Sequence, residues 1–163
     1  MMSDTQPRFH STAAFVADIT VAKNFYTEIL GQEVEFDFGK NVILKGGITL
    51  WEISPEHIIP EKLGTDAISR RDCNRFEFYF ETKEIVAVVR RLEDAGMDFL
   101  HGLHEEPWGQ RTVRFFDPDR HIIEIGEPLK VFVKRLYKES GSAEAVADRT
   151  GVPPDAVKEI VSQ

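Results

Sequence analysis

The sequence has only one cysteine, Cys73, so the chain cannot form an internal disulfide. A single free thiol is typical of a reducing compartment, and we expect a cytoplasmic protein. No stretch approaches the roughly 20 consecutive apolar residues of a membrane-spanning helix. Met1–Pro7 is polar and lacks the apolar core of a signal peptide. These absences predict that the protein has no membrane partner.

Positive charge is scarce as well. The chain has 20 Lys and Arg residues against 28 Asp and Glu residues, for a formal net charge of −8. A surface with this balance repels phosphate backbones, so we expect no nucleic-acid partner. The sequence also lacks a glycine-rich phosphate loop, the Cys/His spacing of structural zinc and a serine-nucleophile elbow. Phosphoryl transfer and structural zinc binding are therefore unsupported.

The first third of the chain carries the signals of one strand, one helix and three further strands. Apolar residues recur at helical spacing after Asp18, a good N-cap, and Gly31 is a suitable C-terminal stop. Turn residues then separate three short apolar runs. The expected elements are a strand over Phe9–Ala17, a helix from Ile19, and strands over Glu33–Phe38, Asn41–Lys45 and Ile48–Ile53. Residues 54–74 are expected to form a linker with one helical turn.

The same order returns after the linker. Phenylalanines alternate with polar residues over Arg75–Glu81, the period of a strand with two different faces. If the phenylalanines pack under the helix that follows, Glu77 and Tyr79 must face the opposite side, toward a cavity or solvent. The expected elements are this strand, a helix over Lys83–Ala95 capped by Thr82 and ended by Gly96, and strands over Met97–Gly102, Arg111–Phe116 and His121–Gly126.

The two halves match along their length, which indicates an internal duplication. Ser11 and Glu77 are 66 positions apart, and so are Ile19 and Ile85, apolar residues near the starts of the two expected helices. The last strands align at an offset of 72, which pairs Glu52 with Glu124. We therefore predict an α+β domain over residues 8–127, made of tandem β-α-β-β-β modules at 8–54 and 75–127.

A C-terminal helical extension is expected over residues 128–163. Three helices are predicted, over Leu129–Lys138, Ala143–Arg149 and Asp155–Val161, with Ser142 as a cap and Pro153-Pro154 as a start signal. The stretch "AEAVADRTGVPPDAVKEIV" is similar to the two-helix turn of DNA-binding units. From Tyr137 to Gln163, however, three basic residues stand against five acidic ones. Because phosphate contacts need basic side chains, a tail that packs on the domain or on a second subunit is favoured.

Three strings in the double module resemble the vicinal-oxygen-chelate superfamily, the group of glyoxalases, bleomycin-resistance proteins and extradiol dioxygenases. "FVADITVAKNFYTEILG" (Phe15–Gly31) is similar to its first-helix pattern, and "FEFYFETKEIVAVVRRLEDAG" (Phe76–Gly96) is similar to the second-module counterpart. "FFDPDRHIIEIGE" (Phe115–Glu127) resembles the Asp-Pro-Asp-Gly hairpin and the module-ending Glu, with Arg120 in place of the Gly. The resemblance covers residues 9–127 and leaves the tail outside.

The resemblance implies that two curved sheets, each with its helix outside, form an incomplete barrel around a cavity. Metal-dependent members hold their ion on the first and last strands of each module, with the ligands facing inward. Carried over by alignment, those positions are Ser11, Glu52, Glu77 and Glu124.

This donor set departs from the family, which usually offers at least one His. Carboxylates favour Mg²⁺ or Mn²⁺ over Zn²⁺ or Ni²⁺, so the expected cofactor is a divalent cation on Glu52, Glu77 and Glu124, or none. Without a metal, clustered carboxylates repel each other and one holds its proton near neutrality. That leaves Glu77 or Glu124 able to act as a catalytic acid or base. Both alternatives remain open at this point.

The candidates for the substrate cavity are Ser11, Tyr79, Trp108 and Arg111. With a turn over Asp117–Arg120, antiparallel pairing places Val113 opposite Glu124, and this register points Arg111 inward, toward an anionic group of a ligand. The alternative for Arg111 is a surface ion pair. Trp108, in the preceding loop, is expected at the mouth of the cavity or in packing alone. His57, His101 and His104 are expected in exposed loops.

The resemblance implies two functions. The first is a glyoxalase-like lyase or isomerase in which a glutamate moves a proton next to a carbonyl group, with metal assistance where an ion is bound. The alternative is a metal-free protein that binds and sequesters a small molecule, like the bleomycin-resistance members. Extradiol dioxygenases rely on two His ligands, which this chain lacks at the aligned positions. The expected partners are a small-molecule ligand and a second copy of the chain in a homodimer, since paired modules in this superfamily commonly associate edge to edge.

Overall fold

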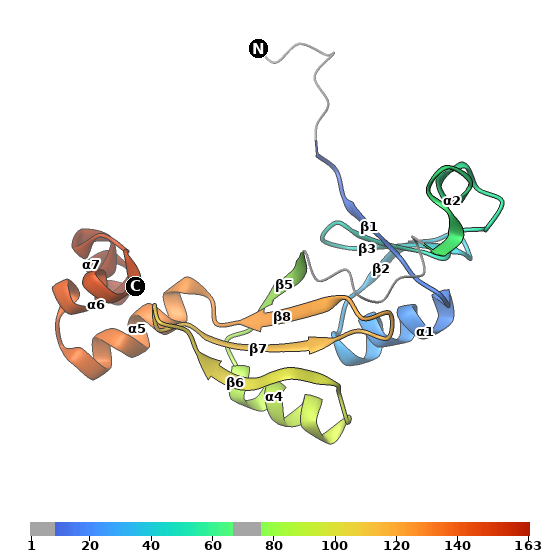
Figure 1. The fold of residues 1–163 in the computed structure, drawn as a ribbon. Helices are drawn as coiled ribbons and strands as arrows, with labels where there is room; N and C mark the ends of the chain where they lie inside the picture. Colours follow the sequence, from blue (N-terminus) through green and yellow to red (C-terminus); the bar gives the residue numbers. More distant parts are fainter. Residues whose placement is uncertain (1–8, 67–75) are drawn as a thin grey trace, which may run out of the picture. The chain divides into compact units, whose positions relative to one another are not determined.

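The computed structural model describes residues 9–66 and 76–163 (Figure 1). Cys73, Arg75 and the polar start Met1–Pro7 lie outside the described residues. The chain divides into two compact units. Among the described residues, one unit contains residues 9–66 and the turn Asp117–Arg120, and the other contains residues 76–116 and His121–Gln163. Among the described helices, none has both the length and the apolar character needed to span a membrane.

The first unit contains a four-stranded sheet. Its elements are β1 (Thr12–Phe15), α1 (Ile19–Asn24), a π-helical turn η1 (Phe25–Ile29), β2 (Val34–Asp37), β3 (Asn41–Leu44), β4 (Ile48–Trp51) and the short helix α2 (Ile58–Leu63). The strand order is β1-β4-β3-β2, with β1 parallel to β4 and the other pairs antiparallel. The Tyr26 side chain is fully buried, and its hydroxyl donates to Asp117 Oδ2 over 3.0 Å.

The second unit repeats this arrangement. Its elements are β5 (Glu77–Glu81), α4 (Ile85–Asp94), β6 (Phe99–Glu105), β7 (Arg111–Phe116) and β8 (Ile122–Gly126), followed by the C-terminal helices. The strand order β5-β8-β7-β6 is the order of the first sheet, and β5 runs parallel to β8. The predicted tandem β-α-β-β-β modules are therefore confirmed.

Local capping explains where the two module helices begin and end. Asp18 accepts hydrogen bonds from the Thr20 and Val21 amides, as predicted for an N-cap. Gly31 and Gly96 follow their helices with φ near +64° and +67°, a backbone shape that glycine adopts without a Cβ clash. The predicted cap Thr82 is wrong: α4 begins at Ile85 after Glu84. The Thr82 hydroxyl instead accepts from the Glu84 amide, in the turn before the helix.

The second sheet has one face under α4 and one face turned away from it. Phe78, Val113, Phe115 and Ile123 are buried on the α4 side, where α4 packs on β6 and β7. Because side chains alternate along a strand, the residues between them point to the other side. We call that other side the site face.

The register of β7 and β8 differs from the predicted one by a single residue. Arg114, not Val113, lies opposite Glu124, and Val113 lies opposite Ile125. The prediction assumed a turn that ends at Arg120, but His121 also lies in the turn and pairing resumes at Ile122. One extra loop residue shifts the whole pairing by one, and such a shift exchanges the faces of a strand.

The offset of the last strands is also corrected. The Glu52 amide donates to Lys40 O over 2.8 Å, and the Glu127 amide donates to Arg111 O over 3.0 Å, so both residues close their sheet in the same way. The counterpart of Glu52 is therefore Glu127. By the same register, Glu124 corresponds to Thr49. The sequence alignment had matched two glutamates by residue type, and that match fell three positions away from the structural one.

The C-terminal tail forms three helices with a core of their own: α5 (Leu129–Ser140), α6 (Ala143–Thr150) and α7 (Pro154–Ser162). Ser142 caps α6 through the Ala145 amide, as predicted. The core of the tail consists of Phe132, Val133, Leu136, Ala143, Val146 and Val157. The tail also packs on the domain, because Arg135 and Arg149 bond to residues of the β6–β7 hairpin.

Candidate functional site

The site face of the second sheet gathers polar side chains from four strands. They are Glu77, Tyr79 and Glu81 of β5, Glu124 of β8, Thr112 and Arg114 of β7, and His101 of β6. Glu124 pairs in register with Tyr79 on one side and with Arg114 on the other, and Arg114 pairs with His101. A polar row therefore crosses the sheet at this level.

Arg114 lies at the centre of a cluster of three carboxylates. Its Nε is 2.9 Å from Glu77 Oε2, its Nη1 is 2.9 Å from Glu106 Oε1, and its Nη2 donates to Glu124 Oε2. His101 Nε2 lies 3.3 Å from the same Nη1. The planar guanidinium thus holds Glu77 and Glu124 next to each other, as its fork of donors permits.

The two paired carboxylates differ in burial and in pKa. The Glu124 side chain is only 6% exposed, whereas that of Glu77 is 37% exposed. Burial, with the hydrogen bond to Glu77, raises the pKa of Glu124 to about 7. Burial also acts to raise the pKa of Glu77, but hydrogen bonds from Arg114 and Glu124 outweigh it and lower that pKa. The pair therefore contains one ionised carboxylate and one carboxyl that exchanges its proton near neutral pH.

Glu106 is the third carboxylate on Arg114. The hydrogen bond from Arg114 lowers the pKa of Glu106, and the Thr112 hydroxyl donates to the same Oε1 over 3.1 Å. Burial acts to lower the pKa of Arg114, but its hydrogen bonds to Glu77 and Glu106 dominate and raise it. Arg114 is consequently a permanent positive charge in the cluster.

A second group of contacts lies beside this cluster and involves two aromatic residues. Gln110 Nε2 donates to the Tyr79 hydroxyl over 2.9 Å, and Trp108 Nε1 donates to Gln110 Oε1 over 3.1 Å. Tyr79 and Trp108 are 47% and 42% exposed. Burial and the hydrogen bond to Glu81 raise the pKa of Tyr79 to about 12, so its hydroxyl stays neutral. The pair offers aromatic surface with fixed polar ends.

The predicted orientation of Arg111 is wrong. Arg111 is on the same side of β7 as Val113 and Phe115, which are buried on the α4 side. Its Nε lies 3.5 Å from Glu105 Oε2, so the alternative of an ion pair holds. His104 also differs from expectation, because β6 extends to Glu105 and includes it, whereas His101 lies within the part of β6 that was expected as the strand Met97–Gly102.

The predicted site residues of the first module take other roles. Ser11, partly exposed, comes just before β1. Glu52 accepts from the Ile19 amide over 3.0 Å and from Lys40 Nζ over 2.8 Å, so it closes the N-terminus of α1. Lys40, followed by the Ile19 amide, lowers the pKa of Glu52. The structural counterparts of Glu77 and Glu124 in this module are Ser11 and Thr49.

The carboxylates of the site face do not fit a divalent cation. The Arg114 guanidinium occupies the position among Glu77, Glu106 and Glu124 and already bonds to all three, and its charge repels a cation. Within residues 9–66 and 76–163, no group of three or more His, Cys, Asp or Glu side chains is arranged to hold a metal ion. The site on Glu52, Glu77 and Glu124 would combine residues of both units, and it stays a prediction from the resemblance.

Sequence reasoning missed Arg114, Glu106 and His101. The predicted register pointed Arg111 inward, and because side chains alternate along a strand, it implied the opposite face for Arg114. His101 pairs with Arg114 across a strand whose register shifts at two points, and Glu106 follows that strand in the loop, an arrangement that no local sequence pattern reveals.

Comparisons with known proteins agree with this architecture. A family model described as "Glyoxalase-like domain" matches residues 9–130. No curated protein sequence matches the chain. Solved structures with the same fold include a protein of unknown function from Agrobacterium tumefaciens, at 32% identity and a TM-score of 0.64, which covers 79% of this chain and 100% of that one.

Two more distant structures share the fold. A glyoxalase/bleomycin resistance protein/dioxygenase from Nocardioides has 20% identity and a TM-score of 0.57, and the match covers 77% of this chain and 86% of that one. A lactoylglutathione lyase from Agrobacterium tumefaciens has 23% identity and a TM-score of 0.54, with 75% and 94% covered. The matching model, the repeated modules and these structures agree. The chain belongs to the glyoxalase-like family of the vicinal-oxygen-chelate superfamily.

Proposed function

We propose that this protein is a lyase or isomerase that moves a proton next to the carbonyl group of a small molecule, with Glu77 and Glu124 as the acid–base pair. The observation that carries the proposal is the cluster itself, in which Arg114 holds an exposed and a buried carboxylate side by side on one face of the sheet. A pair of acids in unlike surroundings is a recurrent arrangement for proton transfer.

In this proposal each member of the cluster has a role. Glu77, the exposed carboxylate, contacts the substrate, removes a proton from the carbon beside the carbonyl and returns it to the neighbouring carbon. Glu124 shares that proton through its hydrogen bond to Glu77, so the pair accepts a proton near neutral pH although Glu77 alone is acidic. Arg114 supplies positive charge where the carbonyl oxygen becomes negative. The carbon-bound proton thus moves to the former carbonyl carbon, and the hydroxyl proton of the first carbon passes to the former carbonyl oxygen, so the product is an isomer of the substrate and no further reactant is required.

Incorporation of deuterium from D₂O tests this proposal. The wild type is incubated with the hemithioacetal of methylglyoxal and glutathione and with small 2-hydroxy aldehydes and ketones, and exchange beside the carbonyl is followed by NMR. We expect exchange with at least one compound, and about a hundredfold loss or more in Glu77→Gln and Glu124→Gln. Glu93→Gln, on α4, is the matched control. No exchange in the panel, or wild-type rates in Glu77→Gln, would sink the proposal.

A metal-free binding function is the second candidate, and the aromatic surface favours it. Tyr79 and Trp108 are both about half exposed and are linked through Gln110, so they can stack on a ligand without chemistry. Calorimetry with bleomycin separates the candidates. Binding that survives Glu124→Gln but fails in Trp108→Ala, without deuterium exchange in the panel, supports the binding protein.

The proposal includes a homodimer in the cytoplasm. The single cysteine of the sequence supports a reducing compartment, and membership of the family supports pairing of modules. Light scattering at micromolar concentration is expected to return the mass of two chains, and a monomer would contradict the dimer.

A further inference from the structure

The loop Glu106–Gln110, between β6 and β7, supplies two side chains to the site face. Glu106 accepts from Arg114 Nη1 over 2.9 Å and from the Thr112 hydroxyl. Gln110 donates to the Tyr79 hydroxyl over 2.9 Å and accepts from Trp108. The conformation of this loop therefore determines whether the carboxylate cluster and the aromatic pair are complete.

The C-terminal helices hold the other side of the same loop. Arg135 on α5 donates from Nη2 to Gly109 O over 2.6 Å and to Glu127 Oε2 over 2.8 Å, and from Nη1 to Glu105 Oε2 over 3.1 Å. Its side chain is 17% exposed. One guanidinium thus joins the loop, the strand before it and the end of β8, through hydrogen bonds strengthened by charge.

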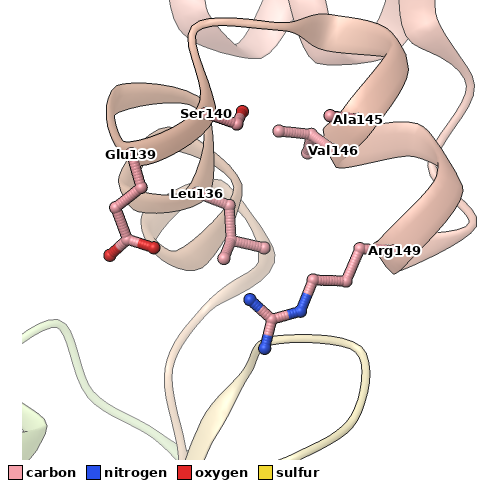
Figure 2. Close-up of a pocket in the computed structure, with 6 residues that line it drawn as sticks. All are labelled: Leu136, Glu139, Ser140, Ala145, Val146 and Arg149. Atoms are coloured by element: carbon pink, nitrogen blue, oxygen red, sulfur yellow. The ribbon is translucent and has the colours of Figure 1, made fainter.

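Arg149 on α6 makes a second connection. Its Nη2 donates to Glu105 Oε1 over 2.7 Å and its Nε donates to Pro107 O over 3.3 Å. Figure 2 shows this side chain extending from α6, past Leu136, toward a neighbouring loop. Leu136, Val146 and Arg149 line a hollow of about 300 Å³ between α5 and α6.

Close packing accompanies these bonds. Gly109 has φ near +90°, and a Cβ added there would lie 2.6 Å from Leu136 Cδ1. A side chain there would require Leu136 or the loop to shift, and the positive φ by itself strains any residue other than glycine. The loop is fixed to the tail by shape as well as by charge.

We propose that the C-terminal helices are a working part of the second module and that Arg135 is a positioning residue, holding the loop Glu106–Gln110 in the conformation that completes the site face. The tail follows the region matched by the family model, which ends at residue 130. The inference rests on the proposed function only in taking the site face as the place of binding and chemistry.

The test measures the loop directly, without a substrate. In Arg135→Met, the Glu106 and Gly109 amides, which donate to Gln110 O and Glu106 O, are expected to exchange with solvent about tenfold faster or more. The Trp108 indole and Gln110 side-chain amide resonances are expected to move. The Val16 amide, bonded to Trp51 O, and the Trp51 indole belong to the other unit and are internal references that should not change.

Variants on the same helices complete the design. Lys130→Met removes a cation of α5 that bonds to Gln163, and it should leave the loop signals unchanged. Arg135→Lys restores a charge, but a compact ammonium lacks the planar fork that spans Glu105, Gly109 and Glu127, so intermediate exchange is expected. If Arg135→Met does not fold, Arg149→Met replaces it as the test, because Arg149 is more exposed. The same amide exchange rates and side-chain resonances are then measured.

Unchanged loop exchange and resonances in folded Arg135→Met overturn the inference, as do unchanged signals in Arg149→Met when Arg135→Met does not fold. Because these signals require no turnover, a failure of the proposed acid–base chemistry appears separately, in the deuterium experiment. A loop that loosens in a protein without lyase or isomerase activity would still establish the positioning role.

Discussion

Arg114 and Glu124 lie directly opposite each other on β7 and β8 and form an ion pair that is almost closed to solvent on the Glu124 side. Proximity to a guanidinium by itself acts to lower the pKa of a carboxyl. Burial and the neighbouring Glu77 act in the opposite direction and dominate at Glu124. As a result, the Glu124 carboxyl gains or loses its proton near pH 7, where many enzymes work.

The first prediction concerns the pH dependence of stability. Folding raises the Glu124 pKa from 4.5 to about 7, so the folded state binds more protons than the unfolded state between these values. The stability contributed by this proton is complete below pH 4.5 and is lost as pH rises through 7. The loss amounts to about 3 kcal/mol. In Glu124→Gln this dependence should disappear. The free energy of unfolding of the variant, relative to that of the wild type, should therefore increase as pH rises.

Urea denaturation between pH 4.5 and pH 8.5 measures the difference between the two proteins. Taking the difference removes the contribution of the histidines and of the carboxylates outside the cluster, which both proteins share, whereas Glu77, whose pKa depends on Glu124, contributes to the difference. Parallel stability curves across this range would show that Glu124 titrates as an ordinary carboxyl.

The second prediction concerns Arg114. Arg114→Met leaves Glu77, Glu106 and Glu124 without their shared cation, and we expect a loss of about 3 kcal/mol in the free energy of unfolding. The pKa of Glu124 should rise further, since its nearest positive charge is removed. Arg114→Lys keeps the charge, but a compact ammonium lacks the planar, five-donor fork that matches the spacing of the three carboxylates, so its stability should be intermediate. Denaturation and carboxyl ¹³C NMR check both effects, and wild-type stability in Arg114→Met would contradict the central role of the guanidinium.

The sequence predicted the modules well because their signals are local. Alternation over Phe76–Glu81 correctly assigned the two faces of β5, so Glu77 was recognised. The partner Arg114 was missed because pairing depends on the number of residues in a turn, and His121 adds one to the expected turn. A hairpin register is a property of two strands and a loop together, and the pattern of one strand cannot fix it.

Glu52 was misplaced for a related reason. Its match with Glu124 used residue type at the end of an apolar run, whereas hydrogen bonds at the sheet edge make Glu127 its counterpart. The positions that do correspond to Glu77 and Glu124 carry hydroxyl residues, Ser11 and Thr49. The carboxylate cluster is therefore a feature of the second module alone.

The third prediction concerns Tyr26. Its buried hydroxyl donates to Asp117, a carboxylate that is only 3% exposed, and burial with this neighbour raises the pKa of Tyr26. Tyr26→Phe removes the donor and should lower the free energy of unfolding by about 1–2 kcal/mol. Tyr137→Phe, at the partly buried edge of the tail core, should change it by less than about 0.5 kcal/mol. Thermal denaturation compares the two, and equal effects would argue against a specific contribution of the Tyr26–Asp117 bond.

The fourth prediction separates two roles for Glu52. As a helix cap, its carboxylate satisfies the Ile19 amide at the start of α1 and pairs with Lys40. Glu52→Ala should then lower the melting temperature by about 2–4 °C, while Glu52→Gln, which keeps an acceptor oxygen, should lower it less. Asp18→Ala provides the comparison, because Asp18 caps the next two amides of the same helix and should lower the melting temperature as well.

As a metal ligand, Glu52 would instead control the binding of Mn²⁺, and calorimetry with Mn²⁺ on wild type and Glu52→Gln reports on that role directly. Binding that is present in the wild type and lost in Glu52→Gln would restore the predicted site on Glu52, Glu77 and Glu124. A melting temperature that falls in Glu52→Ala, with no difference between the two titrations, assigns Glu52 to the helix.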